Sequence, residues 1–129
     1  MVVHCFYDRP GAPDVEVAAP NLTFHRLNGP KFLEMMARCK AVVCTAGFES
    51  VSEAAWLDKG VFLVPVEGHV EQMLNAFEAA RLGLGVTDPV FNLDRLEELP
   101  ASVDNREFRA WVSQGSERLD RVLALATSG

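Results

Sequence analysis

Short apolar runs that alternate with helix-like segments most constrain the fold of this chain. The runs AVVC at residues 41–44 and VFLVPV at residues 61–66 are continuously apolar, which is typical of strands covered on both faces in a parallel sheet. Each run is followed by a segment with apolar residues at helical spacing. This alternation predicts an α/β fold, a Rossmann-like doubly wound parallel sheet with right-handed crossovers and further helices at its C-terminal end.

Turn residues and apolar spacing predict the remaining elements. Strands are expected at residues 2–7, 22–27, 41–44 and 61–66, with a short edge strand at 85–86. Helices are expected from residue 30 to about 40, from 48 to a glycine C-cap at Gly60, from the 67–69 loop to Gly83 and around 93–99. A last helical stretch is expected over 105–126, either continuous or broken at Gly115. Residues 9–20 are expected to form a polar loop. The inner side of the helix before Gly83 is expected to carry Met73, Leu74, Phe77, Ala80 and Leu82.

Length, charge and cysteines bound the class of protein. The length of 129 residues predicts a single domain. The net charge of −6 argues against a basic surface that would bind the phosphate backbone of nucleic acid. No apolar run approaches the length of a membrane span. Cys5, Cys39 and Cys44 form no Cys-x-x-Cys pair and are interpreted as small buried residues in a reducing compartment. The N-terminus lacks the pattern of a signal peptide, so the expected location is the cytoplasm.

Polar residues and a glycine gather where the strand at residues 41–44 gives way to a helix. In open parallel sheets, ligands bind beyond the carboxyl ends of the strands, where the loops at residues 28–30, 45–50 and 67–72 lie. Gly47 lets a ligand approach backbone N–H groups, and the helix dipole there favours an anion such as a diphosphate. Thr45 and Ser50 add hydroxyl donors. Glu53, one turn further on, can accept two hydrogen bonds from the vicinal hydroxyls of a ribose.

The same residues also fit an ordinary helix cap. Ser50 or Thr45 would be the N-cap and Glu53 its partner in a capping box, worth about 1 kcal/mol of stability. Local spacing alone does not choose between the two interpretations.

A further group of polar residues lies where the following helix begins. Glu71 and Gln72 suit sugar hydroxyls, because a carboxylate and an amide can each pair with two O–H groups. They also fit an ordinary polar first turn, and His69 fits a solvated loop residue. Asn75 is expected to cap the helix or tie the loop rather than touch a ligand.

Together, residues 41–76 resemble the nucleotide-sugar donor site of GT-B glycosyltransferases. The closest groups are the UDP-dependent family-1 enzymes and the bacterial N-acetylglucosaminyltransferases of family 28. The family-1 signature His-Cys-Gly-Trp-Asn-Ser, with Glu three residues later, matches the run from Thr45 to Ser50 and then Glu53. The resemblance implies diphosphate contacts from the Gly47 to Ser50 segment, which includes Phe48, and ribose contact from Glu53.

The resemblance extends to the flanking loops. Glu71-Gln72 ahead of Asn75 matches a pair that contacts the donor's sugar in the family, with His69 beside it, and Leu27 and Asn28 fall where such proteins cradle the base. Thr45 replaces the signature histidine, and Glu49 replaces an asparagine and adds negative charge, which suits the family-28-like branch better. A nucleotide-diphosphate sugar is the implied donor, with a UDP-sugar favoured. No catalytic residue, metal site or cofactor is assigned.

A complete GT-B enzyme has two Rossmann-like domains, and this chain resembles the C-terminal, donor-binding one. Residues 2–7 align with that domain's second strand, so its first strand and helix are expected to be lacking, which leaves a sheet edge open to self-association. Residues 108–126 resemble the helix that braces the acceptor domain, so Trp111 or its neighbours should be partly exposed, while most of the apolar stripe of this helix is expected to pack on its own sheet. His4 and His25 are expected to be structural.

The expected function is that of a donor-binding fragment of a hexosyltransferase-type enzyme that moves a sugar to an acceptor hydroxyl. Alone, the chain should bind weakly and not turn over, because its acceptor domain or partner chain is missing. The alternatives are a non-catalytic nucleotide-sugar-binding subunit of a split glycosyltransferase, a fragment of a GT-B nucleotide-sugar 2-epimerase, and a generic flavodoxin-like domain in which the motif only caps a helix.

Overall fold

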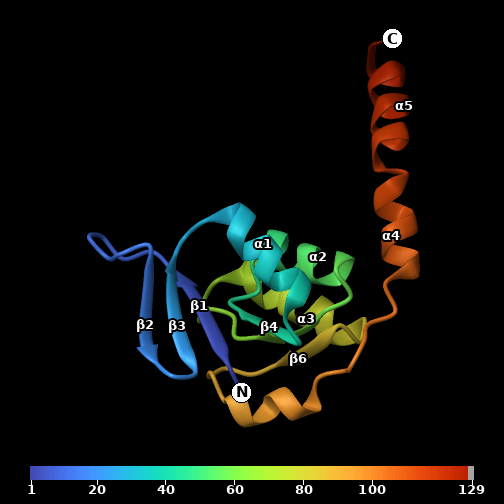
Figure 1. Ribbon diagram of the computed structural model, residues 1–129. Coiled ribbons are helices and arrows are strands. Elements are labelled where there is room, and N and C mark those ends of the chain that lie inside the picture. The colour runs from blue at the N-terminus through green and yellow to red at the C-terminus, as the bar shows by residue number, and fades with distance from the viewer. Residues whose placement is uncertain (128–129) are drawn as a thin grey trace. The chain divides into compact units, whose positions relative to one another are not determined.

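The computed structural model describes residues 1–127 and divides into two compact units, residues 1–38 and the chain from Cys39 onward (Figure 1). Each unit has its own three-stranded sheet. Among residues 1–127, no helix has the length and apolar character that crossing a membrane requires. The expectation of a single domain stays a prediction.

The first unit contains strands β1 (Val3–Tyr7), β2 (Val15–Ala19) and β3 (Leu22–Arg26), followed by helix α1 (Gly29–Arg38). The strand order is β1-β3-β2, with β1 parallel and β2 antiparallel to β3. Strand β2 lies inside the segment predicted to be a loop, so that prediction is wrong there. Prolines at positions 13 and 20 flank the run VEVAA and are typical of a loop, and the strand is stabilised by its pairing with β3 across the turn at residues 20–21.

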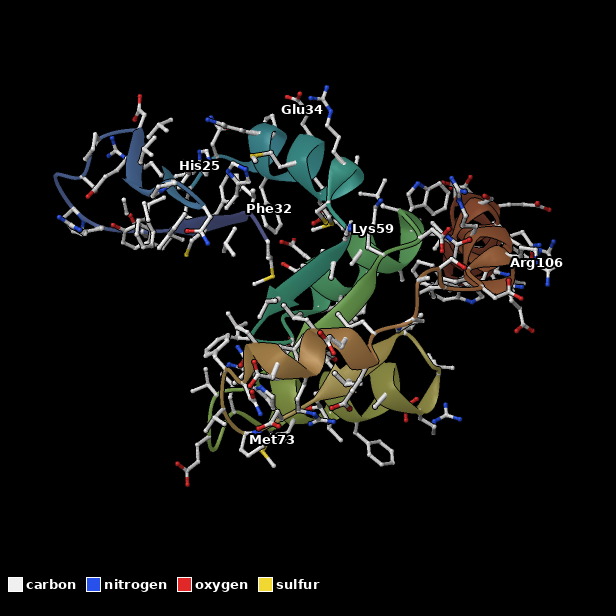
Figure 2. The ribbon with its side chains drawn as sticks, turned by 60° about the horizontal axis from the view of Figure 1, so that its bottom comes forward. His25, Phe32, Glu34, Lys59, Met73 and Arg106 are labelled. Atoms are coloured by element: carbon white, nitrogen blue, oxygen red, sulfur yellow. The ribbon has the colours of Figure 1, made fainter. Side chains whose placement is uncertain are left out.

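Aromatic rings hold β1, β3 and α1 together. Phe6 stacks on His25, with ring centroids 4.7 Å apart, and meets Phe32 of α1 edge-on at 5.2 Å. His25 and Phe32 lie close to each other in Figure 2. His25 is only 4% exposed, and its Nε2 lies 2.9 Å from Nδ1 of His4. This pairing within the small sheet fits the structural role expected for both histidines.

The second unit is built on a parallel sheet with the order β4-β5-β6. Its elements are β4 (Ala41–Cys44), α2 (Phe48–Trp56), β5 (Gly60–Leu63), α3 (Val70–Arg81), β6 (Gly85–Thr87), the 3₁₀ helix η1 (Leu93–Glu98), α4 (Arg106–Ser113) and α5 (Gly115–Thr127). The central strand β5 is buried, with Val61, Phe62 and Leu63 essentially inaccessible. The predicted α/β, Rossmann-like parallel arrangement is therefore confirmed.

The close approach of β5 and β6 requires a glycine at position 85. A Cβ placed on Gly85 would come within van der Waals overlap of the Val61 carbonyl oxygen, so any side chain there would force the two strands apart. The predicted edge strand at residues 85–86 is thus present and is one residue longer than expected.

Helix α2 ends earlier than predicted, and Gly60 is not its C-cap. The helix stops at Trp56, the C-cap is Leu57, and Asp58 adopts the left-handed conformation with φ of 60°. Gly60 instead begins β5, where a Cβ would lie 3.1 Å from the Pro100 carbonyl oxygen. Sequence spacing predicts a cap at Gly60 because it does not reveal the segment at residues 99–100 that packs over this glycine.

The predicted inner face of α3 is wrong. Met73, Leu74 and Phe77 are all more than half exposed, as is Leu82, and Ala80 is also exposed. The helix packs instead through Ala76 and Ala79, each 2% exposed, against β6 and α2. Small alanine side chains let the helix backbone approach its neighbours closely, so the larger apolar residues one face away point outward.

Helix α4 is fastened to the end of α2. Asn105 is 8% exposed, and its Nδ2 donates to the carbonyl oxygens of Ala55 at 2.8 Å and Trp56 at 3.0 Å. The Arg109 guanidinium lies over the Trp56 ring, 4.7 Å from its centroid. These contacts satisfy carbonyls that a helix end leaves without intrahelical partners. Further along, Trp111 is 59% exposed, as expected, but Leu119, Val122 and Leu123 are also more than half exposed, so the expectation that most of this stripe packs on its own sheet is wrong.

Candidate functional site

Two polar loops of the second unit lie beyond the carboxyl ends of neighbouring parallel strands. One connects β4 to α2 over residues 45–47, and the other connects β5 to α3 over residues 64–69. Because β4 and β5 are parallel and adjacent, both loops leave the same edge of the sheet. The structure therefore brings together two of the three loops that the sequence singles out.

The N-terminus of α2 carries no side-chain cap. Its N-cap is Gly47, with extended backbone dihedrals and no side-chain hydrogen bond. The capping alternative, which made Ser50 or Thr45 the N-cap, is therefore wrong. The N–H groups of the first turn have no intrahelical acceptor, and a Cβ on Gly47 would meet nothing within 4 Å. The start of the helix thus has no side-chain cap on its backbone donors, and there is open space where a Gly47 Cβ would stand.

The polar side chains around this helix start differ in exposure. Thr45, Ser50 and Glu53 are half-buried, whereas Phe48 and Glu49 are exposed. Ser50 and Glu53 lie one turn apart on the helix and so share a face. Within the part of the chain that the structure describes, the Glu53 carboxylate enters no hydrogen bond or ion pair and remains available as an acceptor.

The turn before Gly47 is held by a residue from α3. Ala46 is fully buried and has a positive φ of 64°, which L residues rarely adopt. Its carbonyl oxygen accepts a hydrogen bond from Nδ2 of Asn75 at 3.0 Å. Asn75 therefore ties the loop, as the sequence predicts.

The second loop is shaped by the first turn of α3. His69 is the N-cap, and its Nδ1 accepts a hydrogen bond from the N–H of Gln72 at 3.4 Å. Oε1 of Gln72 accepts one from the N–H of Val66 at 2.9 Å. His69 is thus a cap as well as an exposed loop residue. Gln72 is anchored through its oxygen and keeps its amide nitrogen as a donor, and Glu71 is exposed.

Sequence reasoning missed a cavity next to this loop. It has a volume of about 610 Å³ and is lined by residues 65–68, Met73 and residues 87–90, the last being the loop after β6. Met73 lies at the outer edge of this unit in Figure 2. The sequence predicts a short edge strand at residues 85–86, and the loop after that strand could have been included among the candidate site loops.

An arginine braces the wall of this cavity. Nη1 of Arg95 donates to Oδ2 of Asp88 at 2.9 Å and to the Thr87 carbonyl oxygen at 2.8 Å, while Arg95 also pairs with Glu98. The guanidinium beside Asp88 holds the pKa of that carboxyl below its usual value, with a further contribution from the N–H of Val90. The ion pairs and hydrogen bond of Arg95 therefore hold η1 against the end of β6.

The third predicted loop belongs to the first unit. Oδ1 of Asn28 accepts a hydrogen bond from the N–H of Lys31 at 3.0 Å, so Asn28 caps α1, and Leu27 is exposed. Among residues 1–127, no cluster of three His, Cys, Asp or Glu side chains is placed to hold a metal ion.

The parallel Rossmann-like sheet, with polar loops beyond the carboxyl ends of its strands, has the arrangement in which open α/β proteins bind their ligands. The family model described as glycosyl transferase family 1 matches residues 9–103, which is most of the chain. The chain therefore belongs to glycosyl transferase family 1.

A curated relative supports the same assignment. An uncharacterized glycosyltransferase of Methanopyrus kandleri is 31% identical over 97 residues, which is 71% of this chain. The match spans only 28% of that relative's length. No solved structure matches the chain.

Proposed function

We propose that this chain is the C-terminal, donor-binding part of a GT-B glycosyltransferase and takes a nucleotide-diphosphate sugar, with a UDP-sugar favoured. The observation that carries the proposal is the N-terminus of α2, where no side chain caps the helix and open space stands at the Cβ position of Gly47. Membership of the glycosyltransferase family supports it. A helix N-terminus of this kind favours an anion, and a diphosphate is the anion that a sugar donor supplies.

Each candidate residue has a role in this proposal. The diphosphate lies against the N–H groups at residues 47–50 and the hydroxyls of Thr45 and Ser50, and Glu53 accepts from the ribose hydroxyls. Glu71, Gln72 and His69 face the transferred sugar, with the Gln72 amide nitrogen directed by its anchored oxygen. Leu27 and Asn28 are proposed to cradle the base.

The chemistry that follows is the transfer of a sugar to an acceptor hydroxyl. The acceptor oxygen attacks the anomeric carbon, the bond from that carbon to the diphosphate oxygen breaks, and the nucleoside diphosphate leaves. The α2 N–H groups and helix dipole stabilise the negative charge that develops on the leaving group. The acceptor and the group that removes its proton come from another domain or chain.

A second candidate is a non-catalytic donor-binding subunit of a split glycosyltransferase, which lies in the cytoplasm and activates a membrane-associated, acceptor-binding partner. The exposure of Trp111 favours it, since large aromatic residues are enriched in protein interfaces. The two candidates share the donor site. Release of UDP from a UDP-sugar by this chain alone, with an acceptor alcohol present, would contradict both, because each needs a further domain or chain for the acceptor.

The donor site is tested by calorimetric and thermal-shift titration with UDP, UDP-N-acetylglucosamine, GDP and TDP. A ligand at about 100 times its Kd stabilises the folded state by about 2.7 kcal/mol, which a melting curve resolves. Binding of one nucleotide should weaken in Glu53→Ala and persist in Glu97→Ala, a control that removes an exposed carboxylate of η1. If no nucleotide binds the folded chain, the proposed function is wrong.

A further inference from the structure

Asn75 reaches from α3 to the loop that precedes α2. Its Nδ2 donates to the Ala46 carbonyl oxygen at 3.0 Å, across 29 positions of sequence. Since a carbonyl oxygen only accepts, the amide nitrogen is the atom that must face it. The side chain is half-buried, which protects this bond from competition by water.

The residue that Asn75 holds has an uncommon backbone conformation. Ala46 has a φ of 64°, a region that favours glycine, and it is completely buried. It directly precedes Gly47, so its dihedral angles set the direction in which the Gly47 backbone and the first-turn N–H groups of α2 point. A contact that selects this conformation therefore also selects the orientation of the donors.

The same turn of α3 fastens the neighbouring loop. Oε1 of Gln72, three residues before Asn75, accepts from the N–H of Val66, which follows β5. One short stretch of helix thus holds the loops after both β4 and β5. In both contacts the side chain is hydrogen-bonded to the protein backbone, Asn75 through its amide nitrogen and Gln72 through its oxygen.

We propose that Asn75 is a positioning residue for the donor diphosphate. It touches no ligand, and it holds Ala46 in the left-handed conformation that aims the N–H groups after Gly47 at the phosphates. This inference rests on the proposed function. It predicts that losing the Asn75 hydrogen bond weakens recognition of the phosphates and leaves recognition of the nucleoside unchanged.

The test compares UDP with uridine in wild type, Asn75→Asp and Asn75→Ala. Aspartate keeps the shape of asparagine and replaces the donor with a carboxylate that repels the Ala46 oxygen. We expect the Kd for UDP, measured by calorimetry, to rise about tenfold or more, as for loss of one or two charge-assisted hydrogen bonds. Uridine binding, followed by ligand-detected NMR, should not change. Asn92→Asp is the charge-matched control, because the Oδ1 at position 92 can still accept from the backbone N–H of Asp94.

A rescue separates positioning from mere stability. Glycine adopts a positive φ without strain, so Ala46→Gly combined with Asn75→Ala should recover much of the UDP affinity lost in Asn75→Ala. The double variant also provides a chain to measure if Asn75→Ala alone does not fold. If UDP affinity is unchanged in Asn75→Asp, or if uridine binding falls equally, or if the double variant recovers nothing, the positioning role is wrong. If wild type binds no UDP, the proposed function itself fails.

Discussion

Gly47→Ala separates a glycine needed by the fold from one needed by a ligand. Gly47 has φ of −60° and ψ of 140°, dihedral angles that any residue adopts, and a Cβ there meets no atom within 4 Å. Alanine reduces the freedom of the unfolded chain, which stabilises by about 0.4–1 kcal/mol. It is a poorer N-cap than glycine by a similar amount. The two effects nearly cancel, so the free energy of unfolding should change by less than about 1 kcal/mol.

Ligand binding should respond very differently. The new methyl group would stand in open space beside the Gly47 backbone, which the phosphates are proposed to approach. Hydrogen bonds to charged groups contribute about 1.5–3 kcal/mol each, so losing one should raise the Kd for UDP by about tenfold or more. Thermal melting without ligand and calorimetric titration with UDP measure the two effects separately. A variant that melts and binds like wild type would refute close approach of a ligand to this backbone.

Two further predictions concern charge. Glu49→Gln removes an exposed acidic side chain from the first turn of α2, so UDP binding should strengthen by about two- to threefold at low salt and by little at 1 M salt. The melting temperature should fall slightly. Unchanged affinity at low salt, measured by calorimetry, would place the diphosphate elsewhere. Burial, with help from Lys31 and His4, lowers the pKa of His25 below 6.5. The unfolded chain therefore binds this proton more readily, so stability is full above about pH 6.5 and falls as the pH drops below it. The melting temperature should decrease from pH 7.5 to 5.5 by more in wild type than in His25→Phe, and equal decreases would contradict the assignment.

The exposed apolar face of α3 illustrates a limit of periodicity. Met73 and Phe77 follow helical spacing as a buried stripe would, yet the helix packs through Ala76 and Ala79. Both faces are apolar by sequence, and the choice between them depends on how near the helix lies to β6 and α2. Side-chain volume against a neighbouring element decides that distance, and the neighbour is not visible in the local pattern.

The candidate site, too, was predictable from the sequence only in part. That polar residues and a glycine follow β4 and β5 was predictable, because strand ends, helix starts and turn residues are encoded within a few positions of one another. The cap of α2 was not, because Thr45 and Ser50 have the right chemistry for a cap and lie at the right place. Only the backbone dihedrals show that Gly47 takes that position.

By itself, the sequence determined the order of the elements after β3, the parallel α/β class and the chemistry gathered beyond the strand ends. These depend on local periodicity and on residue types at turns. Tertiary structure alone decided the pairing of β2 with β3, the face on which α3 packs, and the contact between Asn75 and Ala46. Each of these depends on a partner outside the local pattern, whose geometry exists only once the chain has folded.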